Sequence, residues 1–394
     1  MSLFPAHETQ PTLSARRSAP FIRWPVATYE FYISLCVALT PLVVWAMLLL
    51  GWRWCLWLTA CQTGSVGSYL ILRRFTQRGR RLSFIHVFSG AILLALLTPV
   101  GLPFILGLLL GIAHMQCIFF WGGTGRERIT SSLLLAVLCC AATNLGTVGN
   151  IKAQPQGVLA NNRLFMGDNQ DLSRNTYTRW VSSNRIEGHD TVQMRPLQEV
   201  VGNTYHNIGG AIATANLRQQ LEVALVWQLP SPHLAILGAW PSWPGAMSVL
   251  GLLLAGIFLC YRAILRIQST VIFLSALVIA LLLLPIDFSQ PLPSMFLRLG
   301  GFSALQPGEM ATLLFYEIVG SDAWFAAIIV LALPGAEPLT ASGRSRALIL
   351  AAGISALLIR TGIGIPAATL SLLMLQPLHP MLDRYFGRPS WLAK

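Results

Sequence analysis

The chain alternates long apolar runs with short polar segments, which is the pattern of a polytopic membrane protein. A bilayer core about 30 Å thick requires about 20 apolar residues for each crossing helix. Ten runs approach this length, and each predicts a membrane span. They cover residues 30–50, 55–72, 84–97, 104–121, 129–148, 245–264, 267–286, 309–333, 347–361 and 365–382.

Composition supports the same class. Of the 394 residues, 54% are hydrophobic and 11% are charged, and the mean hydropathy is +0.62. Soluble domains carry about 25% charged residues. A soluble globule of this size could not cover its surface with so few charges, which excludes a cytosolic enzyme, a disordered protein and a nucleic-acid binder.

The net charge of +12 is explained by topology. Loops on the cytoplasmic side of a membrane collect Lys and Arg. With the N-terminus inside, seventeen of the 27 basic residues fall on the inward side and three in the short outward segments. The remaining seven lie in a long loop, which escapes the rule. We therefore expect both termini in the cytoplasm and no nucleic-acid partner.

This topology divides the chain into five regions. A cytoplasmic tail at 1–29 precedes a first group of spans at 30–148, and a second group at 244–383 precedes a cytoplasmic tail at 384–394. Between the groups lie an outward polar loop at 149–222 and a stretch at 223–243 rich in Trp and Pro. Because Trp favours membrane interfaces, that stretch is predicted to be interfacial or re-entrant.

Spans three and eight carry matching interruptions. Prolines four residues apart, with a glycine between them, follow both spans, at Pro99 and Pro103 and at Pro334 and Pro338. Interrupted helices at corresponding positions of two halves indicate inverted repeats around a central site. The predicted fold is therefore an all-α polytopic membrane protein with about ten transmembrane helices in two inverted five-helix repeats.

Acidic residues within or beside span eight are the candidates for an ion pathway. Glu317 and Asp322 lie inside the run, and Glu337 follows it. An ionisable group in a span costs about 2.5 kcal/mol or more and is a functional candidate by default. Both span carboxylates lie toward the outward end, so an interfacial position is the alternative. Glu337 has a structural alternative, a contact with Arg344 or Arg346. Arg360, at the outward end of span nine, could pair with a carboxylate, bind a ligand phosphate or snorkel to the interface.

Glycine and histidine provide weaker candidates. Gly122, Gly123 and Gly125 form a turn after span four, and such a turn lets backbone amides approach a cofactor or anion. His86 and His114 lie in spans three and four and could meet, although satisfied core histidines are the simpler interpretation. The seven cysteines lie in apolar runs without metal-ligand spacing.

Short motifs near the C-terminus carry a resemblance over about sixty residues. In order, they are Glu-Pro-Leu-Thr at 337–340, Gly-Arg-Ser-Arg at 343–346, Leu-Ile-Arg-Thr-Gly-Ile-Gly-Ile-Pro at 358–366 and Pro-Met-Leu-Asp at 380–383. Their order and spacing resemble the end of RnfD, a membrane protein of the Rnf ion-translocating electron-transport complex. NqrB, a membrane protein of the sodium-pumping NADH:quinone oxidoreductase, belongs to the same family.

The resemblance implies a membrane subunit of an ion-translocating oxidoreductase in the bacterial inner membrane, with other membrane subunits and the lipid bilayer as its partners. It also implies flavin electron transfer coupled to Na⁺ or H⁺ movement. The family carries FMN as a phosphoester on a threonine of an outward Ser-x-Ala-Thr motif. The corresponding residue here is Thr214, and riboflavin is a further flavin that the resemblance admits.

The chain departs from the family pattern around this motif. Ala211 stands where the family has serine, and Ala367 stands where it has aspartate. Because these departures affect the cofactor more than the fold, two other functions stay open. One is a stand-alone transporter or channel on the same scaffold, and the other is an assembly subunit without flavin.

Overall fold

The computed structural model describes residues 28–76, 83–99, 102–120, 130–145, 232–238, 243–284, 307–338, 340–361 and 365–386. Every regular element in these ranges is helical, which confirms the predicted all-α class. The outward loop, the Gly-rich turn at 122–125 and Thr214 lie outside the described residues. By length and composition, Tyr29–Leu50 and Ala341–Arg360 are each sufficient to cross a membrane, and five further apolar helices are shorter.

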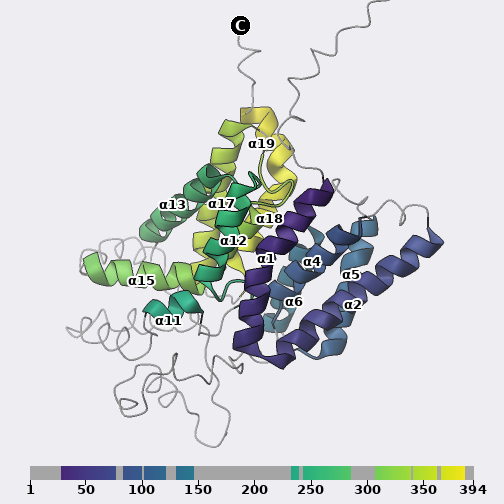
Figure 1. Ribbon diagram of the computed structural model, residues 1–394. Coiled ribbons are helices and arrows are strands. Elements are labelled where there is room, and N and C mark those ends of the chain that lie inside the picture. The colour runs from purple at the N-terminus through teal and green to yellow at the C-terminus, as the bar shows by residue number, and fades with distance from the viewer. Residues whose placement is uncertain are drawn as a thin grey trace, which may run out of the picture.

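The first half of the chain forms a group of helices on one side of the molecule (Figure 1). Their bounds follow the apolar runs, and α4 begins and ends where the sequence predicts span three. Residue Thr98 and the following Pro99 end α4, because proline has no N–H to continue a helix. The helices are α1 (Thr28–Leu50), α2 (Trp52–Phe75), α4 (Phe84–Leu97), α5 (Phe104–Phe120) and α6 (Ser131–Leu145).

The second half forms the neighbouring group, and its helices α12 and α18 contact α1 and α6 of the first. Its elements are α11 (Pro232–Leu237), α12 (Val249–Tyr261), α13 (Ile267–Leu283), α15 (Pro307–Gly320), α16 (Ala323–Phe325), the π-helical turn η6 (Ala326–Val330), α17 (Ala341–Thr361), α18 (Ala367–Leu375), η7 (Gln376–Leu378) and α19 (His379–Phe386).

Span eight differs from its prediction. The run at 309–333 predicts one helix, whereas the structure breaks it at Ser321 and Asp322, between α15 and α16. In Figure 1, α15 lies across the direction of α17 instead of along it. Hydropathy misses the break because the residues on both sides are apolar.

The segment that leads into α12 is buried between the two groups. Residues 243–248 have no helical structure and are all buried, and the Gly245 N–H donates to the Leu96 carbonyl over 2.7 Å. A side chain at Gly245 would meet Phe325 and Leu96. Irregular backbone at membrane depth is tolerated where it is buried in protein. Of the stretch predicted to be interfacial or re-entrant, 223–243, only Trp243 belongs to this segment, and it is buried.

Helices α2 and α5 pack so closely that their backbones are in contact. A Cβ at Gly64 would overlap the Leu108 carbonyl, and one at Gly111 would overlap the Cys61 carbonyl. Small residues permit this approach in membrane helices, where packing drives association. The Ser65 hydroxyl adds a hydrogen bond to the Gly111 carbonyl over 3.0 Å.

Gly64→Ala is therefore expected to lower the stability of the chain by about 1–3 kcal/mol, the usual cost of overpacking. The measurement is thermal unfolding of the full chain in detergent. Gly67→Ala is the matched control on the same helix, because its Cβ would meet nothing. Equal melting temperatures for the two variants would show that α2 and α5 do not pack in this way.

Candidate functional site

Asp322 lies at the break in span eight and binds the start of α18. The side chain is 1% exposed. Its Oδ1 accepts from the Ala368 N–H over 2.9 Å, and its Oδ2 accepts from the Thr369 N–H over 2.7 Å. The first amides of a helix lack partners within it and carry partial positive charge. The carboxylate therefore caps α18 from a segment 46 residues upstream.

Glu317 and Arg360 form an ion pair in the interior. Glu317 Oε1 lies 3.0 Å from Arg360 Nε, and the two side chains are 2% and 1% exposed. Arg360 Nη2 also donates to the Leu281 carbonyl over 3.0 Å. The sequence left three roles open for Arg360: pairing with a carboxylate, binding a ligand phosphate or snorkelling to the interface. The structure shows the first. The pair connects α15, α17 and α13 beside the break.

Glu337 lies on the turn that precedes α17. Its Oε2 is 3.0 Å from Arg344 Nε and 4.0 Å from Arg266 Nη1. Burial raises the pKa of the Glu337 carboxyl, while the Ser269 hydroxyl and these two arginines act in the opposite direction. Nearby, the backbone N–H and hydroxyl of Thr340 donate to Asp383 Oδ1 over 2.9 and 2.7 Å. The C-terminal motifs thus contact one another, and the structural alternative for Glu337 agrees with its contacts.

The predicted site residues do not converge on one point. Glu317 and Asp322 flank the break in span eight but bind different elements, and Glu337 lies beyond η6. Thr214 and the glycines at 122, 123 and 125 lie outside the described residues. The three acids therefore connect helices that are distant in sequence, and their assignment to an ion pathway stays a prediction.

The last carbonyl groups of α4, before the interruption at Pro99, have hydrogen-bond donors among neighbouring residues. Pro99 cannot donate to the Ala95 carbonyl, and the Thr98 hydroxyl lies 3.4 Å from that oxygen. Gly245 N–H donates to Leu96, and Cys140 Sγ donates to the Leu97 carbonyl over 3.2 Å. Because free backbone groups are costly in lipid, these contacts stabilise the end of α4 inside the protein.

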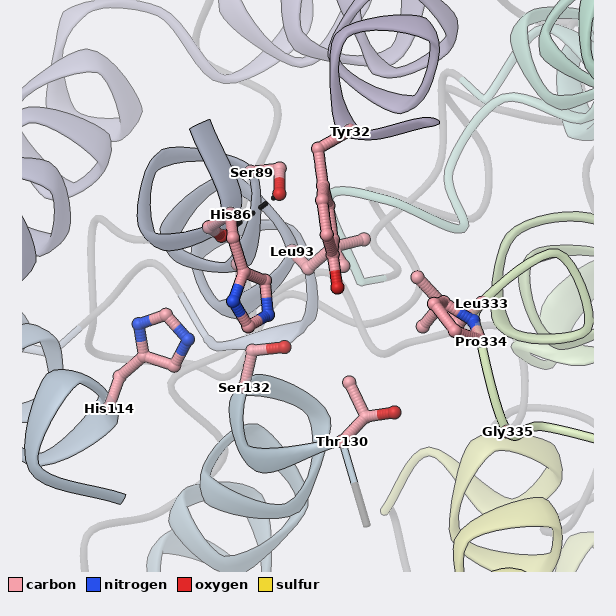
Figure 2. Close-up of a pocket in the computed structure, with 11 residues that line it drawn as sticks. Tyr32, His86, Ser89, Leu93, His114, Thr130, Ser132, Leu333, Pro334 and Gly335 are labelled. Carbon is pink, nitrogen blue, oxygen red and sulfur yellow. Dashed lines mark hydrogen bonds between the residues drawn. The ribbon is translucent and has the colours of Figure 1, made fainter. Parts of the chain in front are cut away.

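A polar pocket of about 100 Å³ lies where the two groups of helices meet (Figure 2). In the topology predicted from the sequence, the starts of α4 and α6, and therefore this pocket, would lie on the inward side. Elements from both halves line it, including the exposed turn at Pro334 and Gly335. Its polar lining comes from the side chains of Tyr32, His86, Ser89, His114, Thr130 and Ser132.

His86 and His114 meet in this pocket, as their positions in spans three and four allow (Figure 2). The His86 ring lies against Tyr32, with 4.4 Å between the ring centroids. His114 Nδ1 is 3.3 Å from the Ser65 hydroxyl, whose single hydrogen is donated to the Gly111 carbonyl. With that hydrogen bond in place, Nδ1 of the neutral ring carries the hydrogen and donates to the Ser65 oxygen, while Nε2, which packs against Gly90, keeps its lone pair.

Sequence reasoning found the two histidines but missed the hydroxyl-bearing residues of the pocket. Tyr32 belongs to an apolar run and carries no motif. Thr130 and Ser132 did have a signal, since a Thr-Ser-Ser sequence before an apolar run is typical of a helix N-terminus.

Pockets for drug-sized ligands span about 300–1,000 Å³. A cavity of about 100 Å³ therefore suits a small group and is too small for a flavin ring system.

The sequence matches the NQR2, RnfD, RnfE family over residues 15–390. The chain belongs to this family. The membership confirms the resemblance seen in the C-terminal motifs and agrees with a polytopic membrane protein. No curated protein matches the sequence. As a member of the family, the chain is a membrane subunit of the Rnf and Nqr type, and other membrane subunits are its general class of partner.

Proposed function

We propose that the chain is a membrane subunit of a redox pump, in which electrons pass through flavin and drive Na⁺ or H⁺ across the bacterial inner membrane. Family membership over residues 15–390 is the observation that carries this proposal. The distribution of Lys and Arg supports cytoplasmic termini and an outward loop.

Thr214 is the residue to which FMN would attach, through a phosphoester with its hydroxyl. A bound flavin would supply one-electron chemistry, while the protein supplies position and electrostatics. The described pocket is too small for a flavin ring system. The FMN proposal therefore depends on Thr214 and on the family pattern, and riboflavin stays a prediction from the same pattern.

The described residues support a scaffolding role in such a pump. Asp322 fixes the start of α18 at the break, and the Glu317–Arg360 pair connects α15 to α17. These contacts hold the interruption in span eight in a defined structure, although it is not a regular helix. In transporters, broken helices of this kind form the site around which the two halves move.

Covalent flavin is tested by mass spectrometry of the intact chain, purified from cells that hold the flavin transferase. We expect an added mass equal to FMN less water, and in-gel fluorescence that survives denaturation. Thr214→Ala should abolish both signals, whereas Thr204→Ala on the same loop should leave them unchanged. An unmodified wild-type chain would remove covalent FMN from the proposal.

The alternative of a stand-alone transporter is favoured by the departures at Ala211 and Ala367. It predicts ion flux into liposomes that contain this chain alone, without an electron donor. Flux that requires the donor and partner subunits would contradict it. The other alternative is an assembly subunit without flavin. It predicts that the chain associates with membrane partners and shows neither flux nor bound flavin.

A further inference from the structure

The turn between α12 and α13 has a fixed shape and leaves two arginines exposed. Ile264 and Leu265 are buried and anchor the turn in the protein. Ala263, at φ 55°, is the left-handed residue that commonly closes the C-terminus of a helix. Arg262 and Arg266 flank these three residues and are both exposed. The turn therefore presents two positive charges from a rigid backbone.

Arg262 is oriented by a neutral partner, so its charge is not compensated. Its Nε donates to the Ser34 hydroxyl on α1 over 3.2 Å, and Ser34 is buried. This contact fixes one edge of the guanidinium and leaves both terminal nitrogens for a ligand. Among the described residues, none forms an ion pair with Arg262, including Glu30, which lies one helical turn before Ser34.

Arg266 adds a second charge, which its neighbours balance only in part. Its Nη1 lies 4.0 Å from Glu337 Oε2, and its side chain is 41% exposed. Arg344 Nε approaches the same carboxylate oxygen to 3.0 Å and is the closer partner. Glu337 therefore faces two arginines, and Arg262 on the same turn has no carboxylate at all. These four groups carry an excess of positive charge.

Exposed tyrosines and apolar side chains place this turn at the level of a membrane interface. Tyr261, directly before Arg262, and Tyr29, at the start of α1, are both exposed. Tyrosine is enriched where hydrocarbon meets water. Ile257 on α12 and Ile267 on α13 are exposed beside the arginines, and the two helices diverge from the turn (Figure 1). Charge at the turn and apolar surface beside it match the two parts of a phospholipid.

We propose that this turn binds the headgroup of an anionic phospholipid, with its phosphate on Arg262 and Arg266 and its acyl chains along the exposed faces of α12 and α13. A guanidinium presents its N–H groups in a planar fork that matches phosphate oxygens. A zwitterionic lipid would bring a positive charge of its own to a turn that already has an excess. In the topology predicted from the sequence, the lipid lies in the inward leaflet. This inference does not depend on electron transfer.

The test measures the lipid affinity of the full chain in dodecyl maltoside, an uncharged detergent. Native mass spectrometry follows bound lipid during titration with phosphatidylglycerol, and phosphatidylcholine with the same acyl chains is the control. Two basic groups at an anionic headgroup should make phosphatidylglycerol bind roughly tenfold more tightly than phosphatidylcholine. A wild-type chain that binds both lipids equally overturns the proposal and leaves an acidic segment of a protein partner as the alternative ligand.

Matched double variants place the effect at the turn. Arg262→Gln combined with Arg266→Gln should weaken binding of phosphatidylglycerol roughly tenfold. Arg73→Gln combined with Arg74→Gln removes the same charge from the exposed end of α2, on the same predicted side, and should weaken it less than about twofold. Arg262→Lys combined with Arg266→Lys keeps the charge but loses the planar fork, and should give an intermediate affinity. An equal loss in the two glutamine variants would show general attraction without a site and would overturn the assignment.

Discussion

Glu317→Gln is expected to lower the stability of the folded chain by about 3–5 kcal/mol, the usual cost of removing one member of a buried ion pair. The variant leaves the Arg360 guanidinium, 1% exposed, without the carboxylate that lies 3.0 Å from its Nε. The hydrogen bond from Arg360 to the Leu281 carbonyl does not neutralise the charge. Thermal unfolding of the full chain in detergent, followed by tryptophan fluorescence, measures the loss.

Two further variants separate the buried charge from the loss of a carboxylate as such. Glu30→Gln makes the same chemical change at an exposed position on α1, and it should leave the melting temperature within error of the wild type. Glu317→Gln combined with Arg360→Met removes both charges and should recover much of the loss, because the buried charge then disappears. A double variant no more stable than Glu317→Gln alone would contradict this explanation.

The helices could be predicted because membrane spans are constrained by a single variable, the length of an apolar run. The span predicted at 84–97 coincides with α4. Pro99 marks its end in the sequence, because proline has no backbone N–H with which to continue the helix. The same reasoning predicts span eight incorrectly. Ser321 and Asp322 interrupt it, but the apolar residues on both sides keep the mean hydropathy of the run high, so the run looks continuous.

The partners of the buried charges could not be predicted from the sequence. Asp322 in the middle of an apolar run did indicate a residue that needs compensation. Its partners are backbone amides 46 and 47 residues downstream, and backbone amides leave no mark in a sequence. For Arg360, pairing with a carboxylate was one of three options, and only the fold, which brings Glu317 of α15 to Arg360 of α17, identifies that carboxylate.

The pocket between the two halves was hidden for a different reason. Its polar groups come from several helices, each contributing one or two residues. Tyr32 stands alone in an apolar run and resembles an ordinary interfacial residue. Only the fold brings it near the starts of α4 and α6. The inverted relation between the halves stays a prediction from the matched prolines.

Asp322→Asn tests whether this carboxylate is a helix cap or an ion-pathway residue. Both carboxylate oxygens accept backbone N–H groups, so an amide at this position must direct its own NH₂ at one of them. Hydrogen bonds to charged groups contribute about 1.5–3 kcal/mol each, and we expect a loss of roughly 3 kcal/mol. The expected signs are a lower melting temperature and faster hydrogen exchange at Ala368 and Thr369.

Asp383→Asn is the matched control for this substitution. Asp383 accepts both bonds from Thr340 on the single oxygen Oδ1, and asparagine keeps one such oxygen. Its loss of stability should therefore be clearly smaller than that of Asp322→Asn. An Asp322→Asn chain that unfolds and exchanges as the wild type does, but no longer supports ion movement in the assembled complex, would instead make Asp322 part of the ion pathway. The two roles give opposite results, because a cap acts on the folded state itself and an ion-pathway carboxylate acts only on transport.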